Sequence, residues 1–263
     1  MPPILTLLTD FGYRDWYVAA VKGVILSRVP HATIVDIAHE VPPGDVEAAA
    51  FLLGAAARSF PPGTVHLAVV DPGVGSARRM LAVETPAAGG PSFFLAPDNG
   101  LLEPFFAAAR IVSIERRDLF LDNPGNTFHG RDRFAPAAAF LLSGGHFDQL
   151  GPTVDDPIRL EVPPPLRSAT RLSCRVAHVD RYGNLVTDLP SGWLPTDTAF
   201  RVTLGDAENT ARRVGCYAEL APGEVGLLDG SLGTIELSLR GASLAEAWGV
   251  GRGDRIEIEL ELK

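Results

Sequence analysis

Three consecutive prolines at positions 163–165 divide this chain into two stretches with different hydrophobic periodicities. Proline lacks a backbone N–H and has a fixed φ, so the segment suits an extended linker and no regular element. Before it, apolar runs alternate with helical patterns; after it, strand-like patterns dominate. The sequence therefore predicts two domains, at 1–160 and 169–263, joined by a linker at 161–168.

The first 160 residues alternate between strand patterns and helix patterns. Buried strands are predicted at 4–8, 33–37, 64–70, 80–84, 93–96 and 111–114. Helices are predicted at 16–29, 45–59, 101–109 and 130–142, the second with Asp45 as its N-cap. This alternation predicts βαβ units, and hence an α/β domain with a mostly parallel, doubly wound sheet.

The second stretch shows the period of two that is typical of half-buried strands. Between 256 and 262, Ile256, Ile258, Leu260 and Leu262 alternate with glutamates. Residues 199–204 and 234–239 show similar patterns, with glycine turns between the strands. We therefore expect a smaller all-β, barrel-like domain at the C-terminal end.

Composition narrows the classes of function. The net charge of −9 argues against a nucleic-acid partner. No apolar stretch approaches the roughly 20 residues that a membrane helix needs, and positions 1–10 predict a first strand and no signal peptide. Cys174 and Cys216 form no CxxC motif, which favours reduced thiols and a cytoplasmic protein.

Three acidic residues follow predicted strands of the first domain, namely Asp10, Asp71 and Asp98. Ligands of parallel α/β sheets bind beyond the carboxyl ends of the strands, so these acids suggest a polar pocket. The alternative is that they cap helices and form turns.

The richest polar segment is Asp71-Pro-Gly-Val-Gly-Ser-Ala-Arg78. Its two glycines let the backbone turn sharply and approach a ligand. It lacks the third glycine of a dinucleotide-binding fingerprint and the GK[ST] of a P-loop. The alternative is a tight strand connection in which Asp71 and Arg78 simply pair.

His129 lies where a helix is expected to begin. The helix dipole there lowers the pKa of an imidazole and favours its neutral form, which can accept a proton. The alternative is a structural histidine. The spacing of His129 and Asp132 could also bind a metal, but no second histidine lies close by, so no metal site is predicted.

Two loops of the second domain carry polar groups. Asp180-Arg-Tyr-Gly-Asn184 lies between two apolar strands, and the amide of Asn184 could read an adenine edge because it both donates and accepts. The loop at 229–233 offers backbone N–H groups and the hydroxyl of Ser231 to an anion such as a carboxylate.

Five motifs, in order along the chain, resemble those of one family. They are Leu8-Thr-Asp-Phe-Gly12, Val70-Asp-Pro-Gly-Val-Gly75 with Arg78, Ala96-Pro-Asp-Asn-Gly100, Thr127-Phe-His-Gly130 and Asp180-Arg-Tyr-Gly-Asn184. Together they resemble the S-adenosylmethionine (SAM) hydrolases, or SAM hydroxide adenosyltransferases, which are related to the fluorinase and chlorinase. The resemblance extends over nearly the whole chain.

The resemblance implies hydrolysis of SAM at the ribose C5′ carbon, which gives adenosine and methionine. It implies a homotrimer with active sites at subunit interfaces, and no metal or organic cofactor. By the same resemblance, Asp71, Arg78 and His129 form a water-activating triad. Asp10 holds the ribose hydroxyls, and Phe128 belongs to the substrate-binding residues.

The remaining predicted binding residues lie in the second domain. The resemblance assigns Asn184 to adenine, with Tyr182 near the ring, and Asp180 to the methionine ammonium group. It assigns Ser231 to the methionine carboxylate, although the local sequence is Asp-Gly-Ser-Leu-Gly where the family has Asn-Ser-x-Gly.

The chain departs from the halogenases at three places. The fluorinase has a tyrosine in place of Asp71 and a Tyr-Ser pair in place of His129-Gly130, and it carries an inserted loop where this chain has only residues 85–92. Three other functions stay open from the residues themselves. They are a chlorinase, a non-catalytic SAM- or adenosine-binding module, and a metal-dependent phosphoesterase with Asp10, Asp71, Asp98 and His129 as ligands.

Overall fold

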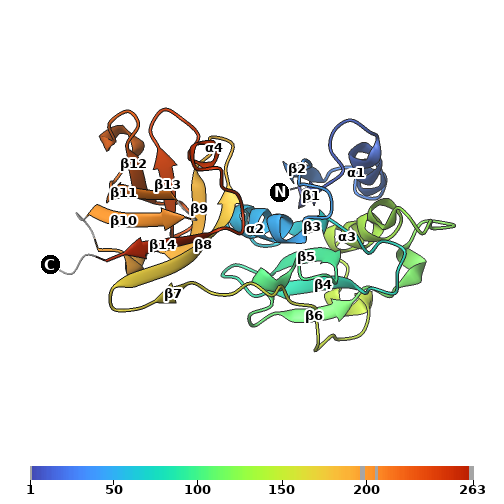
Figure 1. The fold of residues 1–263 in the computed structure, drawn as a ribbon. Helices are drawn as coiled ribbons and strands as arrows, with labels where there is room; N and C mark the ends of the chain where they lie inside the picture. Colours follow the sequence, from blue (N-terminus) through green and yellow to red (C-terminus); the bar gives the residue numbers. More distant parts are fainter. Residues whose placement is uncertain (1, 196–198, 205–206, 261–263) are drawn as a thin grey trace. The chain divides into compact units, whose positions relative to one another are not determined.

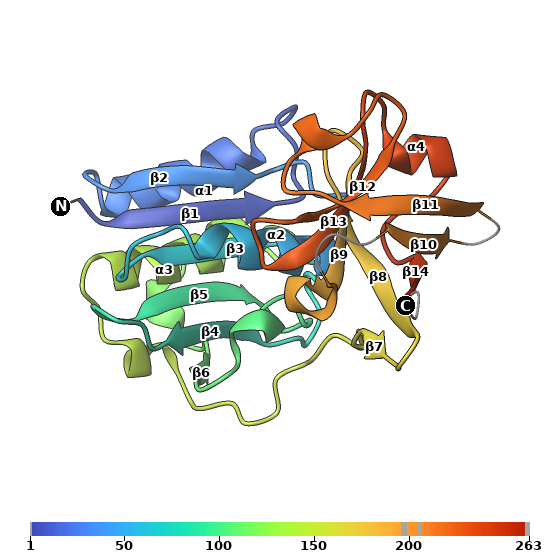
Figure 2. The same ribbon diagram turned by 90° about the vertical axis from the view of Figure 1, so that its left-hand side faces the viewer.

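The computed structural model describes residues 2–195, 199–204 and 207–260. The chain divides into two compact units, Met1–Glu161 and Val162–Lys263, which are shown in Figures 1 and 2. Within the stretch predicted as a linker, Leu166 and Arg167 form a short strand, β7, that pairs with the second unit's sheet. The domain boundaries at 160 and 169 stay a prediction.

The first unit is built on a sheet with the strand order β2-β1-β3-β5-β4-β6 (Figure 2). Its strands are β1 (Ile4–Thr9), β2 (Thr33–Ala38), β3 (Val65–Val69), β4 (Met80–Thr85), β5 (Ser92–Pro97) and β6 (Arg110–Ser113). β2, β1, β3 and β5 are parallel neighbours, whereas β4 runs antiparallel to β5 and β6. The prediction of a mostly parallel sheet is confirmed.

Helices cover both faces of this sheet. Side chains of α1 (Tyr17–Arg28) and α3 (Ala135–Leu142) share one core with Leu5 and Leu7 of β1. Side chains of α2 (Val46–Ala57) share a second core with Leu8. Since alternate residues of a strand point to opposite faces, the two cores lie on opposite sides of the sheet. The doubly wound arrangement is therefore confirmed.

Local sequence explains where these helices lie. In α1, Val18, Val21 and Ile25 are spaced by three and four residues and are buried. The Asp45 carboxylate accepts a hydrogen bond from Ala48 N at 3.0 Å, as expected of the N-cap of α2.

Two helix predictions in this unit need correction. The helix predicted at 101–109 is only a 3₁₀ turn at Glu103–Phe105, because Pro104 removes a backbone donor and Ala108 adopts a left-handed φ of 56°. The helix predicted at 130–142 begins as a π-helical turn, Gly130–Phe134, and only then continues as α3.

The second unit is a β-barrel. Its strands are β7 (Leu166–Arg167), β8 (Arg171–Val179), β9 (Leu185–Pro190), β10 (Ala199–Leu204), β11 (Ala207–Arg213), β12 (Val225–Asp229), β13 (Thr234–Leu239) and β14 (Arg255–Glu259). Within the described ranges, seven of them follow the order β14-β10-β11-β12-β13-β9-β8, and β8 pairs back with β14. This closure confirms the barrel-like prediction.

The alternating pattern at 256–262 has the predicted effect. Ile256 and Ile258 are fully buried in the barrel core, and the neighbouring glutamates face outward from it. Leu262 lies outside the described residues. A short helix, α4 (Leu244–Trp248), follows β13 and begins at the N-cap Ser243. Over residues 2–195, 199–204 and 207–260, no helix has the length and apolarity needed to cross a bilayer.

Candidate active site

A cavity of about 330 Å³ opens at the carboxyl ends of β1 and β3 in the first unit. Asp10 directly follows β1, and Asp71 lies just beyond β3, so these neighbouring parallel strands deliver both carboxylates to one sheet edge. Phe128 and His129 complete the predicted residues that line the cavity. The first unit thus brings four of its five predicted site residues to one cavity, and the fifth, Arg78, contacts two of them.

The connection from β3 to β4 shapes one wall of the cavity. Val74 N donates to Asp71 O at 3.2 Å, and the Ser76 hydroxyl donates to Gly73 O at 2.7 Å. Gly75 has a φ of +83°, and a Cβ at this position would lie 2.8 Å from Asn126 O. Glycine is therefore required by both the backbone conformation and the close approach of the segment that precedes His129.

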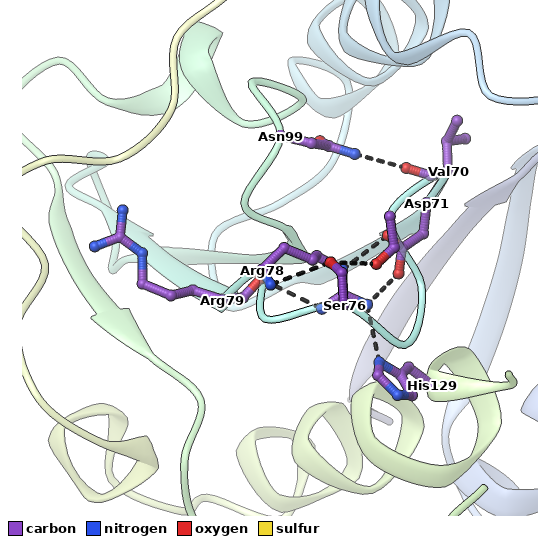
Figure 3. A network of polar contacts seen from close by, with 8 residues as sticks. Val70, Asp71, Ser76, Arg78, Arg79, Asn99 and His129 are labelled. Carbon is purple, nitrogen blue, oxygen red and sulfur yellow. Dashed lines mark hydrogen bonds and ion pairs between the residues drawn. The ribbon is translucent and has the colours of Figure 1, made fainter. Parts of the chain in front are cut away.

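The Asp71 carboxylate and the Arg78 guanidinium form a bidentate ion pair (Figure 3). Arg78 Nε donates to Asp71 Oδ1 at 2.8 Å, and Arg78 Nη2 donates to Asp71 Oδ2. Both side chains are buried, with 9% of Arg78 and 6% of Asp71 exposed. Such bidentate pairs are stronger than neutral hydrogen bonds and fix the geometry of both groups.

The same guanidinium holds His129. Arg78 Nη2 lies 3.0 Å from His129 Nδ1 (Figure 3). Arginine can only donate, so Nδ1 accepts, and the proton of the neutral imidazole resides on Nε2. Nε2 is buried, and no residue in the described part of the chain hydrogen-bonds to it.

The pKa of His129 is lowered to about 4, first by burial and then by the charges of Arg133 and Arg78. The lowered pKa was expected from the start of a helix, but these two arginines and burial are the causes in the structure. At neutral pH His129 is consequently uncharged and presents an N–H to its surroundings.

Asp10 is held by the loop that precedes α2. Gly44 N donates to Asp10 Oδ2 at 2.9 Å, and Gly44 has a φ of +73°. Phe128 packs edge-on against Phe11 and Tyr17, with ring centroids 5.8 and 5.1 Å apart. These contacts form an aromatic wall beside the two carboxylates.

Asp98 does not join this cavity. Its carboxylate accepts from Arg79 Nε at 2.7 Å and from Ile158 N at 2.8 Å, and Asp98 is not among the residues that line the cavity. Figure 3 shows the Arg79 side chain extending away from Asp71 and His129. The interpretation of three strand-end acids in one pocket is therefore wrong for Asp98, which has a structural role. Its neighbour Asn99 supports the site instead, since its amide donates to Val70 O at 2.9 Å.

The second unit has a separate cavity of about 740 Å³. Asp180, Tyr182 and Asn184 line it together with Tyr217 and residues 238–243. Tyr182 is 77% exposed, so its ring is available to a planar ligand. Three of the four predicted residues of this unit therefore share one cavity.

The Asp180 carboxylate organises the turn between β8 and β9. Its Oδ1 accepts from the backbone N–H groups of Tyr182 and Asn184, at 2.8 and 2.9 Å, and its Oδ2 accepts from Asn184 Nδ2 at 2.8 Å. Gly183, with a φ of +82°, lies so close to Ser243 that a Cβ would be 2.0 Å from the serine hydroxyl. The Asn184 side chain keeps its carbonyl oxygen and one N–H for a ligand.

Ser231 lies elsewhere in this unit. It is exposed in the turn between β12 and β13, closed by the hydrogen bond from Gly233 N to Gly230 O at 3.0 Å. It is not among the residues that line the cavity with Asp180. Its assignment to the methionine carboxylate stays a prediction that this geometry does not support.

Comparison with known proteins places the chain in a family. A model of the SAM hydroxide adenosyltransferase N-terminal domain matches residues 5–151, and a model of the C-terminal domain matches residues 174–257. The chain belongs to the SAM hydroxide adenosyltransferase family. Its two matched domains contain, respectively, the triad cavity and the cavity with Asp180 and Asn184.

Individual members of the SAM hydroxide adenosyltransferase family and their relatives resemble the chain over its length. An (R)-S-adenosyl-L-methionine hydrolase from Salinispora tropica is 37% identical, with 97% of each chain covered. A fluorinase from Nocardia brasiliensis is 27% identical, covering 98% of this chain and 97% of its own. The crystal structure of an uncharacterized conserved protein from Thermotoga maritima matches with a TM-score of 0.90 and 35% identity. The match covers 97% of this chain and 99% of that protein.

In this family member, sequence reasoning overlooked several cavity residues. Thr127 and Phe11 line the first cavity and belong to motifs that the sequence analysis identified. Their positions next to Phe128 and Asp10 in the sequence could have indicated that they line it. Tyr217 lines the second cavity, and its hydroxyl contacts Glu236. No local pattern marks Tyr217, because several strand pairings, from β11 through β12 and β13 to β9, bring residue 217 near the loop of Asp180.

A metal site would need several carboxylate, imidazole or thiolate donors close together. Among the described residues, no three or more histidine, cysteine, aspartate or glutamate side chains gather in a way that could hold a metal ion. Asp98, one of four ligands in the phosphoesterase alternative, is committed to Arg79 and Ile158. That alternative therefore lacks its ligand cluster.

Proposed function

We propose that the protein hydrolyses S-adenosyl-L-methionine at the C5′ carbon of its ribose and gives adenosine and L-methionine. The observation that carries this proposal is the buried Asp71–Arg78–His129 triad at a cavity that also holds Asp10. Membership in the SAM hydroxide adenosyltransferase family and the similarity to a SAM hydrolase support the same reaction.

The reaction is an in-line displacement. A bond forms between the water oxygen and C5′ while the bond between C5′ and sulfur breaks, and its electron pair goes to sulfur. Methionine leaves as a neutral thioether, so no acid is needed on that side. Holding water at near-attack distance contributes roughly 7–11 kcal/mol in well-oriented cases.

Within the triad, Asp71 is our candidate for the proton acceptor. Both Asp71 oxygens accept from Arg78, but each keeps a second lone pair for water. His129 cannot take the proton in this arrangement, because Nδ1 faces Arg78 and Nε2 carries hydrogen. The Nε2–H group of His129 can instead donate a hydrogen bond to the water oxygen. This contact would orient the other lone pair of the water oxygen toward C5′.

The two units contribute different binding groups to this proposal. Asp10 would accept hydrogen bonds from the ribose hydroxyls beside the aromatic wall of Phe128. In the second unit, Asn184 would pair with the adenine edge, with Tyr182 against the ring. Asp180 keeps lone-pair capacity for the methionine ammonium group after its three hydrogen bonds within the turn.

Incubation with SAM in oxygen-18 water tests the reaction. We expect adenosine labelled at its 5′-hydroxyl and an equal amount of methionine, also in molar chloride, because the Asp71 carboxylate repels an anionic nucleophile. Recovery of mainly 5′-chloroadenosine would identify a chlorinase. Substrate-induced thermal stabilisation without adenosine release would identify a binding module, and inactivation by chelators would restore the phosphoesterase alternative.

We further propose a homotrimer whose active sites form at subunit interfaces. The support is the family resemblance and the division of the candidate residues between two units. Asp71→Ala and Asn184→Ala homo-oligomers should each be nearly inactive. If sites are shared, unfolding, mixing and refolding the two variants should restore part of the activity. Mixed oligomers that are confirmed by mass spectrometry and stay inactive would place each site within one subunit.

We also propose a cytoplasmic location. Cys216 is exposed and free, as expected of a protein that functions where thiols stay reduced. Cell fractionation with an antibody to the chain would test this, and recovery in a secreted or membrane fraction would contradict it.

A further inference from the structure

A third cavity is lined by Arg78, which is not among the residues that line the cavity of Asp10 and Asp71. It has a volume of about 340 Å³ and is lined by the start of β4, the segment after β6 and the π-helical turn. Four arginines line it, at positions 78, 79, 117 and 133. We call it the arginine cavity. The proposed reaction uses only Arg78, so the other cationic groups are unexplained.

Two of these arginines are already neutralised. Arg78 pairs with Asp71, and Arg79 pairs with Asp98 and Asp156. Arg117 and Arg133 differ, since over the described ranges neither forms an ion pair or a side-chain hydrogen bond. The cavity therefore contains two guanidinium groups whose donors are not used by the protein.

Arg133 is the more constrained of the two. Its Nε is buried without a hydrogen-bond partner in the part of the chain that the structure describes, and its guanidinium lies 5.9 Å from the centre of the Phe120 ring. Burial and the charges of Arg78 and Arg117 lower its pKa, whereas Asp132 raises it. Asp132 is itself occupied by Arg131 and Gly125 N. A buried donor without an acceptor is costly, and an anionic acceptor in the cavity would remove that cost.

We propose that the arginine cavity binds the phosphoryl group of a small ligand through Arg133 and Arg117. A guanidinium presents a planar fork of donors that matches the oxygens of phosphate, and two forks can share one dianion. Glu115 also lines the cavity and is exposed, so its carboxylate opposes the anion from the solvent side. The cavity has more room than one phosphate ion occupies, which also admits a phosphomonoester.

Binding of inorganic phosphate to the full-length protein, measured by isothermal titration calorimetry, tests this proposal without any use of turnover. We expect one saturable site per chain. Arg133→Gln and Arg117→Gln should each weaken binding about tenfold or more, as is typical for loss of a charged hydrogen-bond donor. Glu115→Gln should tighten it. Arg117 is exposed, so its variant tests the site even if Arg133→Gln fails to fold.

Arg116→Gln is the matched control. Arg116 is the neighbour of Arg117, pairs with Asp118 and does not line the cavity, so its variant should bind phosphate like the parent protein. Glycerol 3-phosphate, which lacks a nucleoside and so avoids the adenosine site, distinguishes the ligand's source. Tighter binding than phosphate indicates a phosphomonoester, and equal or weaker binding indicates the free anion. No saturable binding of either probe, or binding unchanged in Arg133→Gln and Arg117→Gln, would overturn the proposal.

Discussion

At the scale of single residues, the Nδ1 atom of His129 fixes which nitrogen of the imidazole carries the proton. It accepts from Arg78, and the same Arg78 nitrogen also donates to Asp71. One guanidinium therefore fixes both partners, and it leaves the imidazole with a donor and the carboxylate with acceptors. In the proposed reaction, a water that reached both groups would meet a donor at Nε2 and acceptors at Asp71.

Asp71→Asn should lower kcat by about 10²–10⁴-fold while the Kd for SAM changes little, because the amide cannot accept the proton from water. Single-turnover kinetics and calorimetry measure the two quantities. Asp156→Asn is the matched control, since Asp156 also pairs with an arginine but is 84% exposed and lies outside the cavity. Near-parental kcat in Asp71→Asn would exclude Asp71 as the proton acceptor.

Arg133→Gln should raise the pKa of His129 from about 4 toward its usual value, because the Arg133 charge is the largest lowering cause after burial. The imidazole resonances of His129, followed by NMR against pH, measure this. Arg116→Gln, which removes a charge from a neighbouring segment, should leave that pKa unchanged. An unchanged titration in Arg133→Gln would mean that burial and the Arg78 charge keep His129 neutral without Arg133.

At the scale of elements, the turns that carry the site residues depend on glycines with a left-handed φ. Gly75 lies between Asp71 and Arg78, and Gly44 presents its N–H to Asp10. Neither position tolerates an ordinary residue without strain. Both turns adjoin strands or helices, so a small backbone shift in either turn would move the Asp71 or Asp10 carboxylate directly.

Gly75→Ala should destabilise the protein by about 1–3 kcal/mol and also reduce kcat, because the new Cβ strains φ and collides with Asn126 O at 2.8 Å. Gly63→Ala is the matched control. Gly63 has nearly the same φ, +84°, but no atom lies within 4 Å of the added Cβ. It should lose stability from strain alone and keep its kcat. Equal effects of both variants on kcat would show that the contact with Asn126 is irrelevant to the site.

The elements of the first unit were largely predictable from sequence, and their failures have local causes. Apolar runs located every strand of its sheet within a few residues, most clearly β1 and β3, which are buried on both faces. The helix at 101–109 was wrongly predicted because this segment contains buried leucines. They pack in the same core as α2, but the segment that carries them is irregular. Apolar spacing could not reveal that Pro104 and the left-handed Ala108 interrupt the helix.

The candidate sites were predictable where a strand end or a motif fixed the residue. Asp10 and Asp71 reach one cavity because neighbouring parallel strands end together, whereas Asp98 turns to Arg79, which sequence spacing could not show. Tyr217 and Arg133 reach their cavities only through tertiary packing, so no local sequence pattern predicts their positions. Ser231 shows that a motif match alone does not place a side chain.

At the scale of the whole molecule, two buried histidines make stability depend on pH. His66 Nδ1 forms a hydrogen bond with the Thr6 hydroxyl at 2.8 Å. Burial lowers the pKa of His66 to about 4, and the pKa of His129 is also about 4. Both groups are 1–3% exposed. In an unfolded chain a histidine titrates near 6.5, so the unfolded state binds more protons than the folded state between pH 6.5 and 4.

The free energy of unfolding should therefore be steady above about pH 6.5 and fall as the pH decreases toward 4, by about 3 kcal/mol per histidine at most. Urea titrations at a series of pH values measure it. His66→Gln should reduce the slope, whereas His31→Gln, which removes an exposed histidine, should not change it. A slope that is unchanged in His66→Gln would show that other groups cause the acid sensitivity.

Closure of the barrel also constrains the order of events during protein synthesis. Ser173 of β8 hydrogen-bonds to Glu257 of β14 across 84 positions of sequence, at 2.6 Å. On the ribosome, β8 must wait for β14 to be translated and to leave the exit tunnel before the barrel can close. All strands of the first unit lie between residues 4 and 113, so its sheet can assemble during that interval. A nascent chain stalled before residue 255 would carry a formed first sheet and an open second one, whose unpaired strand is a natural target for a chaperone.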